Sequence, residues 1–432
     1  LTLPILALVE DLSERELQEA IATLRQSELL YETQYFPEVE YSFRHALTHD
    51  VAYGSMLRES RRAIHAKVVW AVETHFGDRA DDFAERLVHH AREGRVWDKV
   101  VRYGRIAGAK AAWRSSNREA VNLLEQALEG LRHLKDDAAN QALAIDIRFD
   151  LRNPSFQLGD LDAATQHLSD ARDLAERLGD QARLARALMY MSHVYWLMGD
   201  QDTAFRTGEQ AARIAQTHGD PERRVRTQFH VGLTHLARCD FRSAIEILRA
   251  TVVSCRSAAL SGPLGPLLSM ALGYLVRALA ELGEFAEAIE LAAEAVQISE
   301  AERRPFSTII AYVSAGYAYD RKGFYKEAVP LLERGLEICR STEERLMTPI
   351  AAGFLGAAYA NSGRARDAVA LLRDAIDDAA SMKLMVNQPA RLVGLGRAQM
   401  ELGDDAAALE CATRAEALAI RQSEPGPQAQ AL

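Results

Sequence analysis

Cysteine is scarce in this 432-residue chain, and its spacing argues against metal or disulfide chemistry. The four cysteines, Cys239, Cys255, Cys339 and Cys411, lie far apart and form no CxxC pair. That absence argues against a disulfide framework and against a zinc knuckle. Widely spaced single thiols are typical of reduced, buried cysteines in a cytosolic protein, so we expect a cytoplasmic location.

An excess of positive charge and an unbroken apolar run are also lacking. Lys and Arg number 51 against 61 Asp and Glu, a net charge of −10. A chain with this balance repels phosphate backbones, so we expect no direct contact with nucleic acid.

Residues 257–276 carry no charge over a membrane-spanning length, but Gly262, Pro263, Gly265 and Pro266 interrupt the first half. A loop followed by a buried helix is therefore expected, with no membrane partner.

Catalytic motifs are missing as well. A P-loop would read GxxxxGK followed by Ser or Thr, and the nearest approach, Gly104 to Ala111, has the wrong spacing and no hydroxyl residue. The sequence contains neither a GxSxG elbow nor a metal-binding Asp pair in a strand context. We therefore expect that the chain is not an enzyme and has no catalytic residue, metal or cofactor of its own. Leu1 stands in place of Met inside an apolar run, which predicts that the chain is part of a longer protein.

What the sequence does contain is a repeat of 40 to 44 residues. In each copy an alanine lies five residues after a turn, and we call these residues the marked alanines. They are Ala120, Ala164, Ala204, Ala244, Ala288, Ala328, Ala368 and Ala408. A second small residue follows most of them after seven positions, and a glycine often precedes them by twelve, as at Gly108, Gly232, Gly316, Gly356 and Gly396. Small residues at these spacings let two antiparallel helices approach closely, which indicates a helix-turn-helix unit.

This pattern resembles the tetratricopeptide repeat, in which small residues mark the close helix contacts. The unit is longer than the common ~34 residues, so helices of about 17 residues are expected. The resemblance covers residues 96–422 as eight units and implies a superhelix with a concave inner surface. The predicted fold class is therefore all-α, a tetratricopeptide-like α-solenoid. Residues 423–432 are polar and contain proline, so we expect a flexible tail there.

The first 50 residues do not follow the repeat. Ser13 and Glu16 form a capping box ahead of an amphipathic helix, and the runs 29–34 and 39–44 flank Phe36-Pro37-Glu38 as a β-hairpin. A helix followed by a hairpin is the core of a winged helix. We therefore assign residues 1–50 to a small winged-helix-like domain and residues 51–95 to connecting helices. The helix before the hairpin carries four Glu against two Arg, which favours a structural role over DNA binding.

Residues 29–73, which include YFPEVEYSFRHALTHDVAYGSM, resemble a segment of bacterial STAND-type signalling ATPases, especially those that carry a class III adenylate or guanylate cyclase domain. In that family a P-loop ATPase module leads into a winged helix and then a tetratricopeptide-like arm. The resemblance implies that the chain's own N-terminal ATPase module, with its ATP or ADP and Mg²⁺, is a partner domain outside this sequence.

His45 is the candidate nucleotide-sensing residue that the resemblance implies. In STAND proteins a His in a hydrophobic-x-His-x-Leu setting at the end of the wing donates to the β-phosphate of ADP. Phe43-Arg44-His45-Ala46-Leu47 is similar, with Ala46 where the related motif of plant immune receptors has Asp. The alternative is that His45 caps the helix that begins there. His45 and His49 also have the i, i+4 spacing of metal ligands, but no third ligand is near, so no metal site is expected.

Alignment of the units by their marked alanines places a set of aromatic, His and Arg residues on the concave face. They are Phe149, Phe156, Tyr190, His193, Trp196, Phe229, His230, Tyr274, Arg277, Tyr317, Arg321, Phe354 and Arg397. Aromatic and Arg side chains are common anchors of peptide interfaces. We therefore predict a groove that binds a protein or a peptide. The alternative is that these aromatic rings fill gaps between long helices as part of the core.

Three functions are compatible with these patterns. The first is a regulatory sensor arm of a STAND-type ATPase, which binds a partner on the concave face and couples it through the winged helix to a nucleotide switch. The second is a free-standing tetratricopeptide scaffold for protein interactions. The third is the C-terminal arm of an ATPase-type transcriptional regulator whose DNA-binding domain lies elsewhere in the protein.

Overall fold

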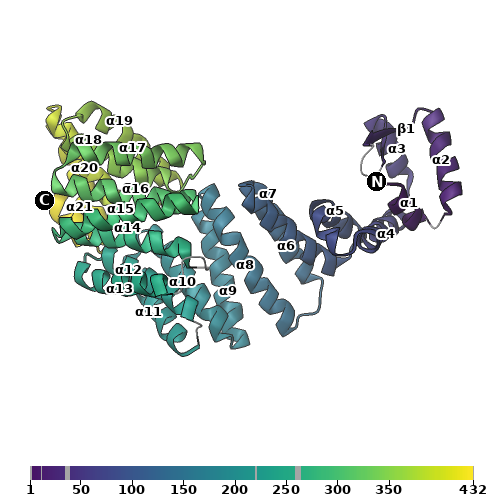
Figure 1. Ribbon diagram of the computed structural model, residues 1–432, viewed down its shortest axis with the longest axis horizontal. Coiled ribbons are helices and arrows are strands. Elements are labelled where there is room, and N and C mark those ends of the chain that lie inside the picture. The colour runs from purple at the N-terminus through teal and green to yellow at the C-terminus, as the bar shows by residue number, and fades with distance from the viewer. Residues whose placement is uncertain (1, 11, 35–38, 219–220, 258–263, 432) are drawn as a thin grey trace. The chain divides into compact units, whose positions relative to one another are not determined.

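The computed structural model describes residues 2–10, 12–34, 39–218, 221–257 and 264–431 (Figure 1). The chain divides into two compact units, Leu1–Pro154 and Ser155–Leu432, which we call unit 1 and unit 2. Helices dominate both units, as the all-α prediction requires. The Phe36-Pro37-Glu38 turn and the part of the Gly/Pro loop at 261–263 lie outside the described residues.

Unit 1 contains a short hairpin followed by helices. Its elements are α1 (Leu3–Glu10), α2 (Glu14–Gln26), β1 (Leu30–Gln34), β2 (Glu40–Phe43), α3 (Ala46–Ser55), α4 (Arg58–Phe76), the 3-10 helix η1 (Gly77–Phe83), α5 (Ala84–Gly94), α6 (Trp97–Trp113), α7 (Asn117–Arg132) and most of α8 (Ala138–Leu158). The core of this unit joins α1, α4, α5 and α6 through buried side chains such as Val68, Leu87 and Tyr103.

The N-terminal helix and hairpin agree with the sequence pattern. The backbone N–H of Glu16 donates to Ser13 Oγ, and the backbone N–H of Ser13 donates to a Glu16 carboxylate oxygen at 3.0 Å, so the capping box is formed. β1 and β2 pair antiparallel, with Leu30 opposite Phe43. The predicted β-hairpin is therefore confirmed.

Unit 2 consists of helices that follow one another through short turns. After the end of α8 they are α9 (Leu161–Leu178), α10 (Gln181–Leu197), α11 (Gln201–His218), α12 (Pro221–Ala237), α13 (Phe241–Ser257), α14 (Gly265–Glu281), α15 (Phe285–Glu302), α16 (Pro305–Lys322), α17 (Tyr325–Ser341), α18 (Thr348–Asn361), α19 (Ala365–Ser381), α20 (Gln388–Glu401), α21 (Asp405–Gln422) and α22 (Pro425–Ala431). Each even-numbered helix from α10 to α20 pairs with the helix that follows it, and we call these even-numbered helices the first helices. Successive first helices also contact one another.

The repeat forms because small residues stand where helices touch. All eight marked alanines are buried, and seven of them are fully inaccessible to solvent. A Cβ atom added to Gly356 would lie 2.4 Å from Leu372 Cγ, and one added to Gly316 would lie 2.5 Å from Leu332 Cγ. These distances are shorter than any normal carbon contact, so glycine is required at this approach. The tetratricopeptide-like solenoid predicted from the spacing is thereby confirmed.

The turn before each marked alanine needs a left-handed backbone. Gly323 has φ 84° and Gly363 has φ 80°, which glycine adopts without steric cost. Cys239 occupies the equivalent turn position with φ 61°. A residue with a Cβ atom loses about 1–2 kcal/mol in this conformation, so neighbouring contacts must hold Cys239 there.

Unit 2 winds far enough that its late helices meet its early ones. The backbone N–H groups of Met385 and Val386 both donate to the carbonyl oxygen of Leu197, at 2.8 and 2.9 Å. We call the contacts between residues 157–202 and residues 344–424 the seam. The seam joins the two ends of one superhelical turn by backbone as well as side-chain hydrogen bonds.

The C-terminal end differs from the prediction. Residues 423–432 were expected to form a flexible tail, but α22 is helical and Glu424, just before it, is only 5% exposed. Gln201 Nε2 donates to Glu424 Oε1 at 3.0 Å, and Lys383 Nζ lies 2.5 Å from Asp162 Oδ2 in the same seam. Polar residues of this segment, such as Glu424, therefore form hydrogen bonds across the seam.

Two further observations concern helix length and membranes. Most helices of unit 2 have 17 or 18 residues, close to the expected length, whereas α18 and α20 have 14 each. Within the described ranges, no helix is both long and apolar enough to cross a membrane.

Replacement of Gly356 by Ala tests the close helix approach. Leu372 is fully buried and has no room to move, so Gly356→Ala should lower the free energy of unfolding by about 1–3 kcal/mol. Gly394→Ala is the matched control, because its Cβ would meet neighbours at an ordinary 3.4 Å and helix propensity would favour Ala by up to about 1 kcal/mol. Urea unfolding followed by circular dichroism measures both. Equal stabilities of the two variants would contradict the role given to Gly356.

Candidate functional site

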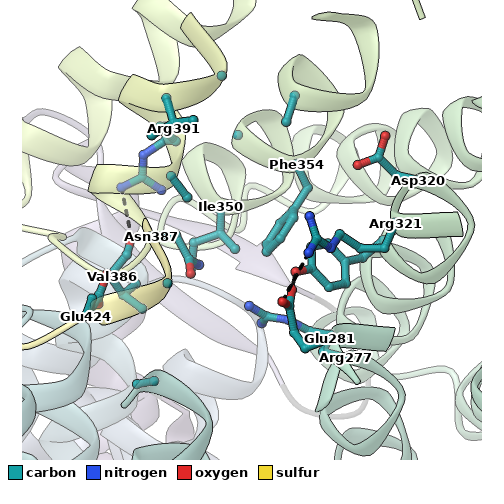
Figure 2. A pocket seen from close by; sticks show the side chains of 18 of the residues that line it. Arg277, Glu281, Asp320, Arg321, Ile350, Phe354, Val386, Asn387, Arg391 and Glu424 are labelled. Carbon is teal, nitrogen blue, oxygen red and sulfur yellow. Dashed lines mark hydrogen bonds and ion pairs between the residues drawn. The ribbon is translucent and has the colours of Figure 1, made fainter. Parts of the chain in front are cut away.

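A cavity of about 470 Å³ lies inside the superhelical turn of unit 2. This volume is within the range of about 300–1,000 Å³ that is typical of ligand pockets. The cavity is lined by the first helices α10 to α20 and by the segments that precede α20 and α22. Figure 2 shows Arg391, Asn387 and Glu424 on one side of it, with Asp320 and Arg321 on the other.

Arg277 of α14 is surrounded by aromatic rings. Its guanidinium carbon lies 4.8 Å from the ring centre of Phe354, 5.5 Å from that of Tyr274 and 5.7 Å from that of Tyr317. The faces of these rings attract a cation, which offsets part of the cost of burial. Desolvation still lowers the pKa of Arg277, and its Nε has no hydrogen-bond partner among the described residues.

The acidic groups on the α14 and α16 side already have partners. Glu281 accepts a hydrogen bond from the Tyr317 hydroxyl and forms an ion pair with Arg321, whose Nη2 lies 3.3 Å from Glu281 Oε2. Asp320 accepts from Asn361 Nδ2 at 2.9 Å, and burial raises the pKa of Asp320. Neither carboxylate forms an ion pair with Arg277, although the charge of Glu281 acts on it at longer range.

Arg391 of α20 is almost completely buried, with 2% of its surface exposed. Its Nε donates to Gln388 Oε1 at 2.8 Å, and its Nη2 donates to the carbonyl oxygen of Val386 at 3.0 Å. Its Nη1 has no partner in the part of the chain that the structure describes. A Cβ atom on Gly353 would lie 2.8 Å from Arg391 Cγ, so the side chain fits only because residue 353 is glycine. Burial lowers the pKa of Arg391 to about 9, which leaves it charged at neutral pH.

Asn387 is the residue before α20 and has a left-handed backbone, with φ 59°. Its Nδ2 is buried and has no hydrogen-bond partner within the described ranges. The residue lies at the N-terminus of α20, where the unpaired amides of a helix carry partial positive charge. Three donors on the cavity wall, Arg277 Nε, Asn387 Nδ2 and Arg391 Nη1, are thus without acceptors among the described residues.

Buried donors without acceptors are costly, and a ligand that supplies acceptors would remove that cost. In the described part of the chain, neither Arg277 nor Arg391 forms an ion pair. The arrangement therefore suits a ligand that presents hydrogen-bond acceptors to one wall and apolar groups to the aromatic rings. A peptide has both features.

The structure gathers six of the predicted concave-face residues around this cavity. They are Trp196, Arg277, Tyr317, Arg321, Phe354 and Arg397. Others from the same set pack against one another instead: the rings of Phe229 and Tyr274 are 5.8 Å apart, and those of His193 and His230 are 5.2 Å apart.

Three more members of the set lie away from the cavity lining. Phe156 contacts His193 edge to face, Tyr190 lies under Arg186, and Phe149 is buried in unit 1. Their surroundings correspond to the alternative in which aromatic rings fill space between helices. A role of the whole set in partner binding stays a prediction.

Sequence reasoning missed several residues that line the cavity. They are Glu281, Asp320, Ile350, Asn361, Asn387, Arg391 and Glu424. Glu281 and Asn361 stand seven residues before a marked alanine, at the same repeat position as Arg321, so the repeat alignment contained a signal for them. Asn387, Arg391 and Glu424 had none, because their burial depends on closure of the seam.

His45 lies at the N-cap position of α3 in unit 1. Its carbonyl oxygen accepts from the Thr48 backbone N–H at 3.1 Å, but its imidazole makes no capping hydrogen bond and the residue is exposed. The imidazole is therefore accessible, and the nucleotide-sensing role stays a prediction. No group of three or more His, Cys, Asp or Glu residues within the described ranges is placed to hold a metal ion.

Comparison with known proteins agrees with this fold. Residues 155–217, 267–341 and 307–381 match the family described as tetratricopeptide repeat. A Rap protein complexed with Competence and Sporulation Factor superposes with a TM-score of 0.62, at 16% identity, over 85% of this chain and 99% of that one. The Rap conjugation gene regulator of plasmid pLS20, in complex with the Phr* peptide, superposes with a TM-score of 0.56, at 11% identity, over 76% and 96%. The chain thus has the fold of tetratricopeptide repeat proteins.

Two longer proteins also resemble the chain. A Pyrococcus horikoshii signal transduction ATPase with numerous domains, which has a tetratricopeptide repeat sensor, superposes with a TM-score of 0.51 at 13% identity. That match covers 99% of this chain and 62% of the other. An uncharacterized protein of Rhizobium meliloti (strain 1021) is 29% identical over 145 residues, which are 33% of this chain and 14% of the relative. The chain therefore spans only part of the length of both proteins.

The buried Glu424 should make stability depend on pH. Burial raises the pKa of Glu424 to about 7, well above its ordinary value of 4.5. Between these pH values the folded chain keeps a proton that the unfolded chain has lost, so stability falls as the pH rises through this window and stays reduced above it. Glu424→Gln removes the ionisation and should raise the free energy of unfolding by up to about 3 kcal/mol at pH 8, with little change at pH 4.5.

Thermal unfolding of unmodified chain and variant across pH 4.5–8 checks this expectation. Glu410→Gln, an exposed carboxylate of α21 near Arg414, is the control and should leave the profile unchanged. A variant profile parallel to that of the unmodified chain would show that the pKa of Glu424 is the same in the folded and unfolded states, which would contradict this expectation.

Proposed function

We propose that this chain is the sensor arm of a STAND-type signalling ATPase in the cytoplasm, and that it binds a peptide or a segment of a partner protein in the cavity of unit 2. The observation that carries the proposal is the cavity wall itself, where the buried donors of Arg277, Asn387 and Arg391 lack acceptors beside a set of aromatic rings. Acceptors of a ligand bound in the cavity would satisfy these donors.

The comparisons support this proposal at the level of fold. Two of the similar structures are Rap proteins whose complexes hold a peptide or a signalling factor, and a third is a STAND protein with a tetratricopeptide repeat sensor. By analogy, the ligand of this chain would enter the inner face of the superhelix. A ligand shifts a conformational equilibrium only if it binds one of the two states more tightly. In this proposal the tighter state is the one in which the seam is closed around the cavity.

The N-terminal part of unit 1 would carry the signal onward as a winged helix. His45 is the N-cap residue of α3, and Tyr53 of that helix has its hydroxyl 3.0 Å from His65 Nε2 on α4. His65 Nδ1 in turn lies 2.9 Å from His90 Nδ1 on α5. This polar chain links the segment next to the proposed nucleotide contact with the helices that lead into the repeats. The proposed ATPase module, with its nucleotide, Mg²⁺ and an adenylate cyclase domain, would then be the partner of this segment.

The gene sequence on the N-terminal side of Leu1 separates this proposal from its two alternatives. A P-loop module supports a STAND ATPase, and a DNA-binding domain beside it supports a transcriptional regulator of the same superfamily. A gene that encodes neither supports a free-standing scaffold.

Phe354→Ala tests whether the cavity is the binding site. Phe354 faces the cavity and stacks against Arg277, so its loss should weaken capture of short synthetic peptides by about 10-fold to 30-fold, as expected for an aromatic anchor. Fluorescence anisotropy with peptides selected from a random-sequence array measures the affinity. Phe324→Ala, at an exposed turn of the same unit, is the control. Unchanged affinity in a folded Phe354→Ala variant would place the binding site elsewhere.

His45→Gln tests the nucleotide contact in the complete gene product. If His45 donates to a phosphate of bound ADP, its replacement should lower the affinity for a fluorescent ADP analogue by about tenfold, because a charge-assisted hydrogen bond is lost. His49→Gln, four residues along α3, should leave that affinity unaltered. Equal affinities of all three proteins would exclude His45 from the nucleotide site.

A further inference from the structure

We infer that the cavity of unit 2 is built to receive a carboxylate group of its peptide ligand, held by Arg277 with help from Asn387 and Arg391. This inference rests on the proposed function, because it names the chemical group by which the proposed peptide would be recognised. It starts from the balance of charge on the cavity wall.

Four arginines line the cavity, namely Arg277, Arg321, Arg391 and Arg397. Arg321 forms an ion pair with Glu281, and Arg397 donates to Asn361 Oδ1. Within the described residues, Arg277 and Arg391 have no carboxylate within ion-pair distance, although Arg391 is buried and Arg277 is largely shielded from solvent. A cation that is shielded from water and has no counter-ion loses favourable hydration, and an anionic ligand would restore much of that loss.

The acidic residues of the wall form their hydrogen bonds and ion pairs with groups other than Arg277 and Arg391. Glu281 is occupied by Tyr317 and Arg321, and Asp320 by Asn361. Glu424 accepts from Gln201 across the seam. None of these three carboxylates therefore forms an ion pair with Arg277, although the negative charge of Glu281 acts on it at longer range.

The unsatisfied donors define where the ligand group would bind. Arg277 Nε and Asn387 Nδ2 are both buried, and both residues line the same cavity. A guanidinium group presents parallel N–H donors that match the two oxygens of a carboxylate. The N-terminus of α20, which begins after Asn387, adds a favourable dipole. Arg391, which is buried within α20, adds a second positive charge near this helix end.

The aromatic surroundings of Arg277 make the inference testable without unfolding the chain. Arg277 has contacts to the rings of Tyr274, Tyr317 and Phe354 that an unbranched methionine can replace. Arg277→Met therefore removes the charge and keeps the packing. Because it also removes a desolvated cation, its melting temperature should equal or exceed that of the unmodified chain.

The experiment uses short synthetic peptides from a random-sequence array, prepared in three forms. The first has a free C-terminal carboxylate, the second is C-terminally amidated but contains Asp or Glu, and the third is amidated and contains neither. We expect the third form, which has no carboxylate, to bind at least tenfold more weakly than whichever of the first two forms binds more tightly. The preferred form then tells whether the terminal or a side-chain carboxylate is bound.

Arg277→Met should lower the affinity for the carboxylate-bearing peptides at least tenfold, whereas Arg277→Lys, which keeps the charge but loses the parallel N–H donors, should give an affinity between those of Arg277→Met and the unmodified chain. Equal binding of carboxylate-free peptides, or full binding by Arg277→Met, would overturn the inference. If Phe354→Ala abolishes binding while Arg277→Met does not, the cavity is the peptide site but the carboxylate inference is wrong. If no peptide of any form binds the unmodified chain, the proposed function itself fails.

Discussion

Two backbone hydrogen bonds, from the N–H groups of Met385 and Val386 to the carbonyl oxygen of Leu197, hold together one superhelical turn of unit 2. Without this closure the first helices would form an open surface. With it, they enclose a cavity whose wall includes residues from both ends of the turn. Backbone bonds are well suited to this task, because they do not depend on side-chain rotamers that a ligand could displace.

The seam also explains why charged residues are found inside a helical repeat protein. Arg391 is buried because Gly353 leaves space for its stem and because the carbonyl oxygens before α20 accept its hydrogen bonds. Glu424 is buried because the segment before α22 turns back toward Gln201. Neither group improves stability by its charge, since burial shifts the pKa of each toward its neutral form. Stability is thus reduced at the place where a ligand would bind, a pattern common at functional sites.

The repeat architecture was predictable because its determinants are local. The marked alanines and the glycines twelve residues before them set helix spacing through contacts within one helix pair, as the close approach of Gly356 to Leu372 illustrates. The hairpin was predictable for a similar reason. Its alternating polar and apolar residues and its expected turn all fall within the fifteen positions 30–44. Six cavity residues followed from the same alignment, because they occupy the inner face of the first helices.

The sequence by itself therefore determined the helix pairs, their order and the inner face of the superhelix, because each depends on residues one or two helices apart. Only the tertiary structure decided that the turn closes, that residues 423–431 are part of it, and that Asn387, Arg391 and Glu424 face or surround a cavity. The physical reason is that burial of these polar groups arises from contacts between segments far apart in the chain. The periodic sequence pattern does not determine how many repeats complete one superhelical turn.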